Sequence, residues 1–332
     1  MLSKYWTISS KPQADAYSGI LQLVVEDVSE KQLGGWETPG WCIVQNNYIT
    51  INPSQKPMMS SSIQPGQHLE DDAVGVCVMS NREDIAIGDV VVHRKGMRQV
   101  AGIEANDWVQ RVPHYPNIDN SLHLSVLGTP GRTAWISMTK IMKLEPGMTV
   151  GISGCSGMVG VLLAQMAIKN GCTVIGYTST QEKADWLETL GVKPIVSKLM
   201  SIEQLDKATK ELVPDGFDAY HENVCNLHLY TAIQNMKVNG TIALCGLMKS
   251  YTQQMGPGPN LLSTIYKNIN IQGFAIGNYP IHETWNNFHN YMEEIYADFK
   301  FNQHVESGIT QVPVIYNDLY NAYGKGKLVI KI

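Results

Sequence analysis

The sequence has few charged residues and no excess of basic ones. Only 17% of its 332 residues are charged, against about 25% in a typical soluble domain. The 30 acidic and 25 basic residues give a net charge of −5. Proteins that bind nucleic acids or anionic membranes usually carry a basic surface. We therefore expect no nucleic-acid partner and no membrane-surface partner.

Long apolar runs are missing as well. No uncharged apolar stretch approaches the roughly 18 residues that a membrane-spanning helix requires. Residues 1–10 lack the apolar block of a signal peptide. We therefore expect a soluble, cytoplasmic protein.

The six cysteines form no C-x-x-C pair; they are Cys42, Cys77, Cys155, Cys172, Cys225 and Cys245. Such scattered cysteines exclude a disulfide scaffold and the common structural zinc clusters. His68 and Glu70 form an H-x-E, but no nearby cysteine completes a ligand pattern, so we expect no metal site. The G-x-S-x-G elbow of many hydrolases is also missing. The chemistry must therefore come largely from a cofactor.

What is present indicates two domains of different kinds. The first third holds short runs rich in Val and Ile that predict strands in an irregular barrel or sandwich: residues 20–25, 41–48, 73–79 and 89–93. After about Leu122, strands and helices alternate, which predicts a parallel sheet with crossover helices and an α/β fold. The predicted strands there are residues 149–153, 172–177, 194–197, 217–221, 241–245 and 269–274. The predicted helices are residues 158–170, about 182–190, 201–212 and 227–236. We expect the tail from Ile281, with its last strand at 327–332, to return to the first domain, because the six-stranded sheet is complete before it.

The strongest local signal is the segment from Ser153 to Gly160, between a predicted strand and a predicted helix. There Gly154, Gly157 and Gly160 suit a tight turn, a close approach of the backbone to a pyrophosphate, and helix–strand packing. The pattern is G-x-x-G-x-x-G rather than the usual G-x-G-x-x-G, and an ordinary strand–helix turn is the alternative interpretation. The βαβ context favours a nucleotide site.

The end of the second strand bears on the choice between NAD and NADP. NAD-binding folds place an acid there to bind the ribose 2′-hydroxyl, whereas residues 177–181 contain none. Thr178, Ser179 and Lys183 follow, and Lys183 lies in the first turn of a helix, where a positive charge opposes the macrodipole unless an anion is near. Lys198, after the third strand, supplies a possible second cation. The alternative is that Lys183 is a solvated surface lysine. Ser179 and Glu182 have the spacing of a capping box.

In these features together, the chain resembles the zinc-independent members of the medium-chain dehydrogenase/reductase superfamily. It resembles most closely the branch of prostaglandin reductases and NADPH-dependent alkenal double-bond reductases. The segments that carry the resemblance have the order and spacing of that branch: GTPGRTAW (128–135), 153–160, Glu182-Lys183, Glu222-Asn223-Val224, CGLMKSY (245–251), PGPNLL (257–262), Gln272-Gly273-Phe274 and Gly326-Lys327-Leu328-Val329.

The resemblance implies a GroES-like substrate domain in residues 1–122, completed by 295–332, and a Rossmann NADP-binding domain in residues 123–294. It implies NADPH in the cleft between them and a small α,β-unsaturated ketone or aldehyde as substrate. Hydride would pass to the β-carbon, and the resulting enolate would then be protonated. We also expect a homodimer.

The resemblance also assigns residues. Tyr251 matches a loop tyrosine that would hydrogen-bond the substrate carbonyl or relay the proton; the alternative is that it merely caps a loop. Tyr48 matches a tyrosine that we assign to substrate packing. The expected cofactor contacts are Gly154, Ser156, Gly157, Met158, Val159, Thr178, Ser179, Lys183, Lys198, Asn223, Cys245, Phe274 and Ile276.

The chain departs from the family pattern at three places. The D-P-Y-M-R segment of the family reads Asn52-Pro53-Ser54-Gln55-Lys56 here, Lys198 stands where a tyrosine helps hold the 2′-phosphate, and Gly324 replaces an asparagine. Because of the changes in the Asn52–Lys56 segment and at Gly324, the sequence does not identify the substrate. Two other functions stay open on the sequence: a zinc-independent quinone reductase, and an NADPH-binding sensor with little catalysis.

Overall fold

The structure is a computed structural model that describes residues 2–12, 19–27, 39–251, 258–320 and 326–332. The chain divides into two compact units. The first comprises residues 1–128 and 303–332, and the second comprises residues 129–302.

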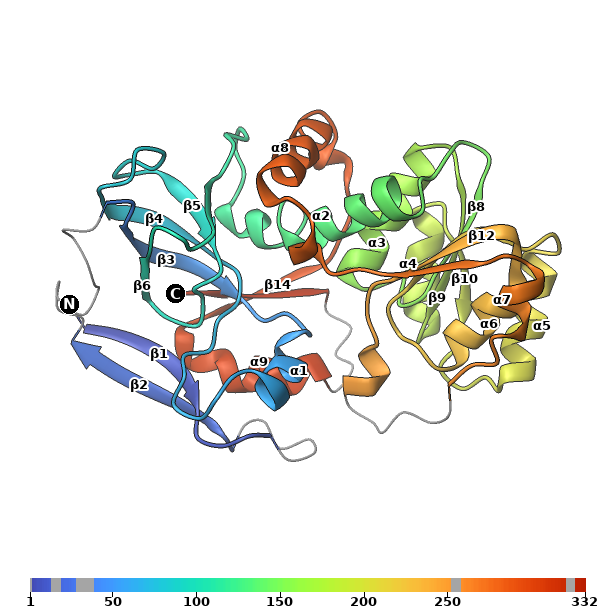
Figure 1. The fold of residues 1–332 in the computed structure, drawn as a ribbon, viewed down its shortest axis with the longest axis horizontal. Helices are drawn as coiled ribbons and strands as arrows, with labels where there is room; N and C mark the ends of the chain where they lie inside the picture. Colours follow the sequence, from blue (N-terminus) through green and yellow to red (C-terminus); the bar gives the residue numbers. More distant parts are fainter. Residues whose placement is uncertain (1, 13–18, 28–38, 252–257, 321–325) are drawn as a thin grey trace. The chain divides into compact units, whose positions relative to one another are not determined.

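The first unit is built on two sheets whose pairings are antiparallel except that between β14 and β15, which is parallel (Figure 1). Its main sheet has the strand order β14-β15-β3-β4-β5-β7, and β6 pairs with β3. The strands are β3 (Cys42–Thr50), β4 (Ala73–Ser80), β5 (Val90–His93), β6 (Val100–Ile103), β7 (Val109–Arg111), β14 (Gln303–Ser307) and β15 (Lys327–Lys331). A separate two-stranded sheet contains β1 (Leu2–Ile8) and β2 (Leu21–Asp27). The four strands predicted here are present, and their ends differ from the prediction by at most two residues.

The end of the chain contributes to the core of this unit. Strand β15 pairs antiparallel with β3, with Val329 opposite Thr50. Thr50 Oγ1 donates a hydrogen bond to Leu328 O at 2.8 Å, and Trp6 Nε1 donates one to Ile309 O at 2.8 Å. Because these bonds are buried, Ile309 and strand β15 are part of the same packed body as the first strands.

The Asn52–Lys56 segment, which departs from the family pattern, lies at a buried cluster of charged groups. Lys327 Nζ donates to Asn52 Oδ1 at 2.6 Å, and the backbone N–H of Asn52 donates to Asp71 Oδ2 at 2.6 Å. Burial and the neighbouring Asp72 raise the pKa of Asp71, while Lys327 opposes the rise. Asn52 thus connects the last strand to the Asp71–Asp72 pair. Gly324 lies outside the described residues.

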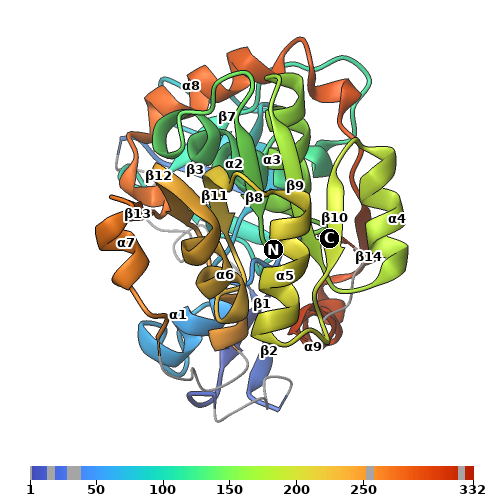
Figure 2. The same ribbon diagram turned by 90° about the vertical axis from the view of Figure 1, so that its right-hand side faces the viewer.

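The second unit holds a parallel sheet with the strand order β10-β9-β8-β11-β12-β13 (Figure 2). The strand pairings in the described part of this sheet are all parallel. The order is that of a doubly wound Rossmann sheet, so the predicted fold class is confirmed. The strands are β8 (Thr149–Ile152), β9 (Thr173–Thr178), β10 (Lys193–Val196), β11 (Phe217–Glu222), β12 (Met236–Leu244) and β13 (Asn270–Gly273).

Four crossover helices connect these strands: α3 (Met158–Lys169), α4 (Gln181–Thr189), α5 (Ile202–Leu212) and α6 (Leu227–Asn235). Helix α5 begins with a capping box in which Ser201 and Gln204 bond each other's backbone N–H groups. The capping box predicted at Ser179 and Glu182 is wrong. Thr180 is the N-cap of α4, and its side chain accepts the N–H of Lys183 at 3.4 Å. Ser179 therefore keeps its hydroxyl for another partner.

The remaining elements are shorter or lie outside the sheets. The α-helices are α1 (Gln55–Ser61), α2 (Thr129–Ile136), α7 (Leu262–Tyr266), α8 (Ile281–Met292) and α9 (Val312–Tyr320). The 3₁₀ and π segments are η1 (Asn120–Leu124), η2 (Ser137–Ile141), η3 (Met248–Tyr251), η4 (Ile276–Asn278), η5 (Tyr296–Asp298) and η6 (Ile309–Gln311). Within the described ranges, none of these helices is long and apolar enough to span a bilayer.

Candidate functional site

The glycine loop after β8 has the geometry of a phosphate-binding turn. Gly154 adopts φ +59°, in the left-handed region, and the N–H of Gly157 donates to Gly154 O at 2.9 Å. Gly157 is also the N-cap of α3 and provides no capping side chain. The first-turn N–H groups of α3, from Met158 and Val159 onward, therefore point out of the helix without an intrahelical acceptor. This end of the helix can accept an anion.

The third glycine of the motif is required by close packing. A Cβ at Gly160 would lie 2.6 Å from Gly154 O and 2.8 Å from Cys155 Cα. Both contacts are with backbone atoms, which cannot turn away. The loop is also tied to the second strand, because the N–H of Cys155 donates to Tyr177 O at 2.9 Å. The loop residues thus fit a pyrophosphate close to the backbone.

The carboxyl end of β9 gathers hydroxyl and ammonium groups. Ser156 Oγ and Thr178 Oγ1 lie 2.9 Å apart, and Lys183 Nζ donates to Ser179 Oγ at 3.1 Å. Partial burial lowers the pKa of Lys183, and the positive charge of Lys198 lowers it further. The ammonium groups of Lys183 and Lys198 repel each other beside the hydroxyl of Ser179. A phosphate dianion bound there would offset this repulsion and form charge-assisted hydrogen bonds.

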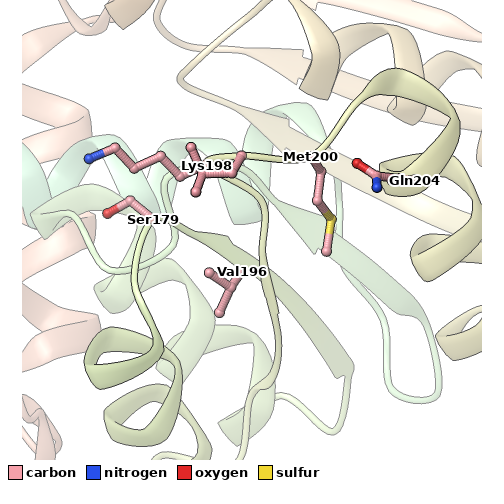
Figure 3. Close-up of a pocket in the computed structure, with 6 residues that line it drawn as sticks. Ser179, Val196, Lys198, Met200 and Gln204 are labelled. Carbon is pink, nitrogen blue, oxygen red and sulfur yellow. The ribbon is translucent and has the colours of Figure 1, made fainter.

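A hollow of about 450 Å³ opens at this point, lined by Ser179, Val196, Lys198, Leu199, Met200 and Gln204. Figure 3 shows the Lys198 ammonium and the Ser179 hydroxyl on the same side of it. The structure therefore brings together five of the predicted contacts: Ser156, Thr178, Ser179, Lys183 and Lys198. Whether they bind a cofactor stays a prediction.

A buried acid at the end of β11 organises the next part of the site. Glu222 is fully buried, and its Oε1 accepts the N–H groups of Val224 at 2.6 Å and Cys225 at 2.8 Å, and the hydroxyl of Ser153. Ser153 Oγ in turn accepts the N–H of Asn223 at 2.8 Å. Burial raises the pKa of Glu222, and these hydrogen bonds partly oppose the rise. In the sequence, Glu222 stands out only as part of the Glu222-Asn223-Val224 motif, and its place at the end of a predicted buried strand is the signal for a special role.

The segment after β12 carries two further predicted residues. The N–H of Cys245 donates to Glu222 O at 2.9 Å, and burial raises the pKa of its thiol to about 12, so the thiol stays protonated. Tyr251 ends the short helix η3, and its side chain lies outside the described part of the chain. Its role stays a prediction.

Phe274 and Ile276 follow β13. The N–H of Phe274 donates to Leu244 O at 3.2 Å, and its ring centroid lies 6.4 Å from that of His221. His221 is fully buried and its Nδ1 lies 2.7 Å from Ser137 Oγ. Burial lowers the pKa of His221 to about 4, so the ring is neutral. The sequence analysis missed this polar pair, because Ser137 and His221 are 84 residues apart.

Tyr48 lies in the first unit, on β3. Its hydroxyl donates to Asp119 Oδ2 at 2.9 Å. Burial and this carboxylate raise the pKa of Tyr48. The ring borders a polar hollow of about 350 Å³ together with Asp119, Asn120 and Lys331. The hydroxyl is therefore already engaged with a carboxylate, and the assignment of Tyr48 to substrate packing stays a prediction.

Among the residues that the structure describes, no three His, Cys, Asp or Glu side chains group closely enough to hold a metal ion.

Comparisons with known proteins extend these observations. A family model described as "Zinc-binding dehydrogenase" matches residues 159–295. The chain is 26% identical to prostaglandin reductase 1 of Bos taurus over 296 residues, which cover 88% of this chain and 89% of that protein. It is 27% identical to 2-alkenal reductase (NADP(+)-dependent) of Nicotiana tabacum over 303 residues, 87% of each chain. It is 30% identical to (+)-pulegone reductase of Mentha piperita over 260 residues, 73% of this chain and 75% of that protein.

Among solved structures, the fold matches that of CurA in complex with NADPH from Vibrio vulnificus. The TM-score is 0.86 at 22% identity, and the match covers 99% of this chain and 98% of the other. The parallel sheet and its phosphate loop thus define a nucleotide-binding α/β enzyme. The chain belongs to the medium-chain dehydrogenase/reductase superfamily, in the branch of prostaglandin reductases and alkenal double-bond reductases.

The packing at Gly160 gives a prediction about stability. Gly160→Ala should lower the free energy of unfolding by about 1–3 kcal/mol, because the added methyl group overlaps backbone atoms of the loop. Gly258→Ala is the matched control, since no atom lies within 4 Å of a Cβ there. Denaturant titration of both variants measures the difference. Equal stability of the two would show that the loop has room for a side chain.

Proposed function

We propose that the protein is an NADPH-dependent reductase of the carbon–carbon double bond of α,β-unsaturated ketones or aldehydes. The relatives named alkenal and pulegone reductases support this substrate class. The observation that carries the cofactor preference is the Ser179–Lys183 contact with Lys198 nearby, at a strand end with no acid. When bound, NADPH supplies the hydride for the β-carbon of the substrate.

The chain's own residues would hold the reactants and the developing charge. The N–H groups at the start of α3 and the Lys183–Lys198 pair bind phosphates, while Asn223, Cys245, Phe274 and Ile276 surround the rest of the cofactor. Tyr251 donates a hydrogen bond to the carbonyl oxygen, which becomes an enolate oxygen as hydride arrives. A phenol with a pKa near 10 stays protonated at neutral pH and can stabilise that charge. Tyr48 packs against the substrate.

Two other functions would use the same fold. A quinone reductase would share the cofactor site, and a sensor protein would bind NADPH without turnover. An NADPH-oxidation screen across enals, enones and quinones distinguishes them. We expect turnover with enals or enones to exceed that with quinones. Turnover of quinones alone, or tight NADPH binding without any turnover, would contradict the proposal.

We further propose that residues 1–122 with 295–332 form the GroES-like substrate domain and that residues 123–294 form the NADP-binding domain. Catalysis is proposed to be independent of zinc, and the protein is proposed to act in the cytoplasm. The changes at Ser54, Lys56 and Gly324 leave the physiological substrate undetermined.

A homodimer is proposed from the edge of the parallel sheet. Strand β13 ends the sheet, and Gln272 and Gly273 on it are exposed. The adjacent helix α7 has no buried residue, and Ile265 and Tyr266 are 74% and 79% exposed. A strand edge that pairs with no other described strand, beside exposed apolar side chains, favours association with a second copy. A solution mass of 36.8 kDa, that of one chain, would contradict the dimer.

The cofactor site predicts a preference between nucleotides. NADPH should bind at least about tenfold more tightly than NADH, roughly 1.4 kcal/mol, because Lys183 and Lys198 pair with the 2′-phosphate. Lys183→Ala should weaken NADPH by about tenfold and leave NADH unchanged. Lys193→Ala, exposed at the opposite end of β10, is the control. Fluorescence titration measures all affinities, and equal NADPH and NADH affinities in the parent protein would refute the assignment.

The proposed hydrogen bond from Tyr251 to the enolate oxygen predicts a change in turnover alone. Tyr251→Phe should lower enone turnover by about 100-fold, the low end for loss of one oxyanion donor. NADPH affinity should stay nearly unchanged, because the contact forms only as charge develops on the substrate. Tyr266→Phe, at an exposed position on α7, is the control. If the Tyr251→Phe protein reduces enones at the parental rate, Tyr251 only lines the pocket and does not stabilise the enolate oxygen.

A further inference from the structure

The turn between β11 and α6 holds two non-glycine residues in glycine-like conformations. Cys225 adopts φ +74°. Asn226 adopts φ +60° and ψ −122°, values typical of the first central residue of a type II′ turn, where glycine predominates. Each such residue costs on the order of 1–3 kcal/mol and persists only when its surroundings hold it. Asn226 is the N-cap of α6, yet its side chain makes no capping bond that would explain the conformation.

The surroundings that hold the turn are the side chains of Glu222 and Ser153. Three successive N–H groups converge on them: Asn223 on Ser153 Oγ, and Val224 and Cys225 on Glu222 Oε1. The carboxylate thus occupies an anion-binding concavity formed by its own following backbone. Its second oxygen, Oε2, is buried and accepts no hydrogen bond from the described residues. Burying the carboxylate of Glu222 costs free energy of solvation. Its presence at this position therefore indicates a role beyond filling the core.

The same turn connects the two loops of the proposed site. On one side, Val224 Cγ2 lies 3.2 Å from the position of a Cβ on Gly154, in the phosphate loop. On the other side, the N–H of Met248 donates to Asn223 O at 2.9 Å, and the N–H of Lys249 donates to Val224 O at 3.2 Å. These residues lead directly to Tyr251. A shift of the turn would therefore move both the phosphate loop and the segment that leads to Tyr251, the proposed hydrogen-bond donor to the substrate.

We propose that Glu222 is a positioning residue of the cofactor site: its buried carboxylate holds residues 223–226 in the strained turn that fixes the phosphate loop and residues 245–249 relative to one another. The inference rests on the proposed NADPH-dependent function, since it assigns a role within the same site. Glu222 contacts the reactants only through Asn223 and the two loops.

The test is a double-mutant cycle between the carboxylate and the strained residue. Glu222→Gln replaces the charged acceptor with a neutral one of the same shape and should weaken NADPH about tenfold, since charge-assisted bonds are lost. Asn226→Gly removes the strain at position 226, while Cys225 stays strained, and should alone change NADPH affinity by less than about twofold. In the double variant the carboxylate has less strain to oppose, so affinity should return to within about threefold of the parent. Ser153→Ala, a milder loss of the same network, should act in the same direction as Glu222→Gln.

A control and a second readout separate positioning from simple loss of stability. Thr209→Val removes a buried hydrogen bond to Tyr177 elsewhere in this unit, 2.8 Å long, and should lower Tm without changing NADPH affinity. Amide exchange at Asn223, Val224 and Cys225 should quicken in the Glu222→Gln protein even without NADPH. If the parent protein does not bind NADPH, the proposed function and this inference both fail. If the parent binds it but Glu222→Gln binds equally well, or Asn226→Gly fails to rescue, only the inference fails.

Discussion

The close approach of the glycine loop to its surroundings is the constraint on which the site depends. The loop must turn out of β8, contact the second strand through Cys155 and Tyr177, and start α3 within a few residues. Only glycine fits at 160, where any side chain would meet backbone atoms. Because the loop is held on all sides, the N–H groups of the first turn of α3 have a fixed direction. A phosphate bound there would in turn fix the rest of a dinucleotide along the carboxyl ends of the strands.

Charge is distributed along those strand ends in a consistent way. Lys183 and Lys198 stand beside hydroxyl groups after β9 and β10, where a phosphate would neutralise their mutual repulsion. Farther along the sheet, the titratable groups are kept neutral or enclosed: His221 has a pKa of about 4, the Cys245 thiol a pKa of about 12, and Glu222 is surrounded by N–H donors. A site of this kind provides orientation and hydrogen bonds, and it leaves redox chemistry to a cofactor.

Much of the fold could be predicted because its signals are local. Alternating strands and helices, glycines at strand–helix turns and the Ser201–Gln204 capping box depend on residues close together in the sequence. The boundary errors have local causes too. Ser179 had the spacing of a cap, but Thr180 took that role, so the hydroxyl of Ser179 was left for Lys183. Strand β12 begins five residues earlier than the predicted start at 241, because Met236 already pairs with Phe217.

By itself the sequence determined the fold class, the phosphate loop, and the absence of an acid after the second strand, because each is carried by residue types at short spacing. Only the tertiary structure decided which distant groups meet. It placed Ser153 against Glu222 across 69 residues, Ser137 against His221 across 84, and the last strand against β3. It also showed that Cys225 holds a positive φ angle. Asn226 combines φ +60° with ψ −122°, whereas asparagine's preference is for the left-handed helical region at positive ψ. Such features arise from packing and hydrogen bonds between elements far apart in the chain, where spacing in the sequence gives no measure of distance.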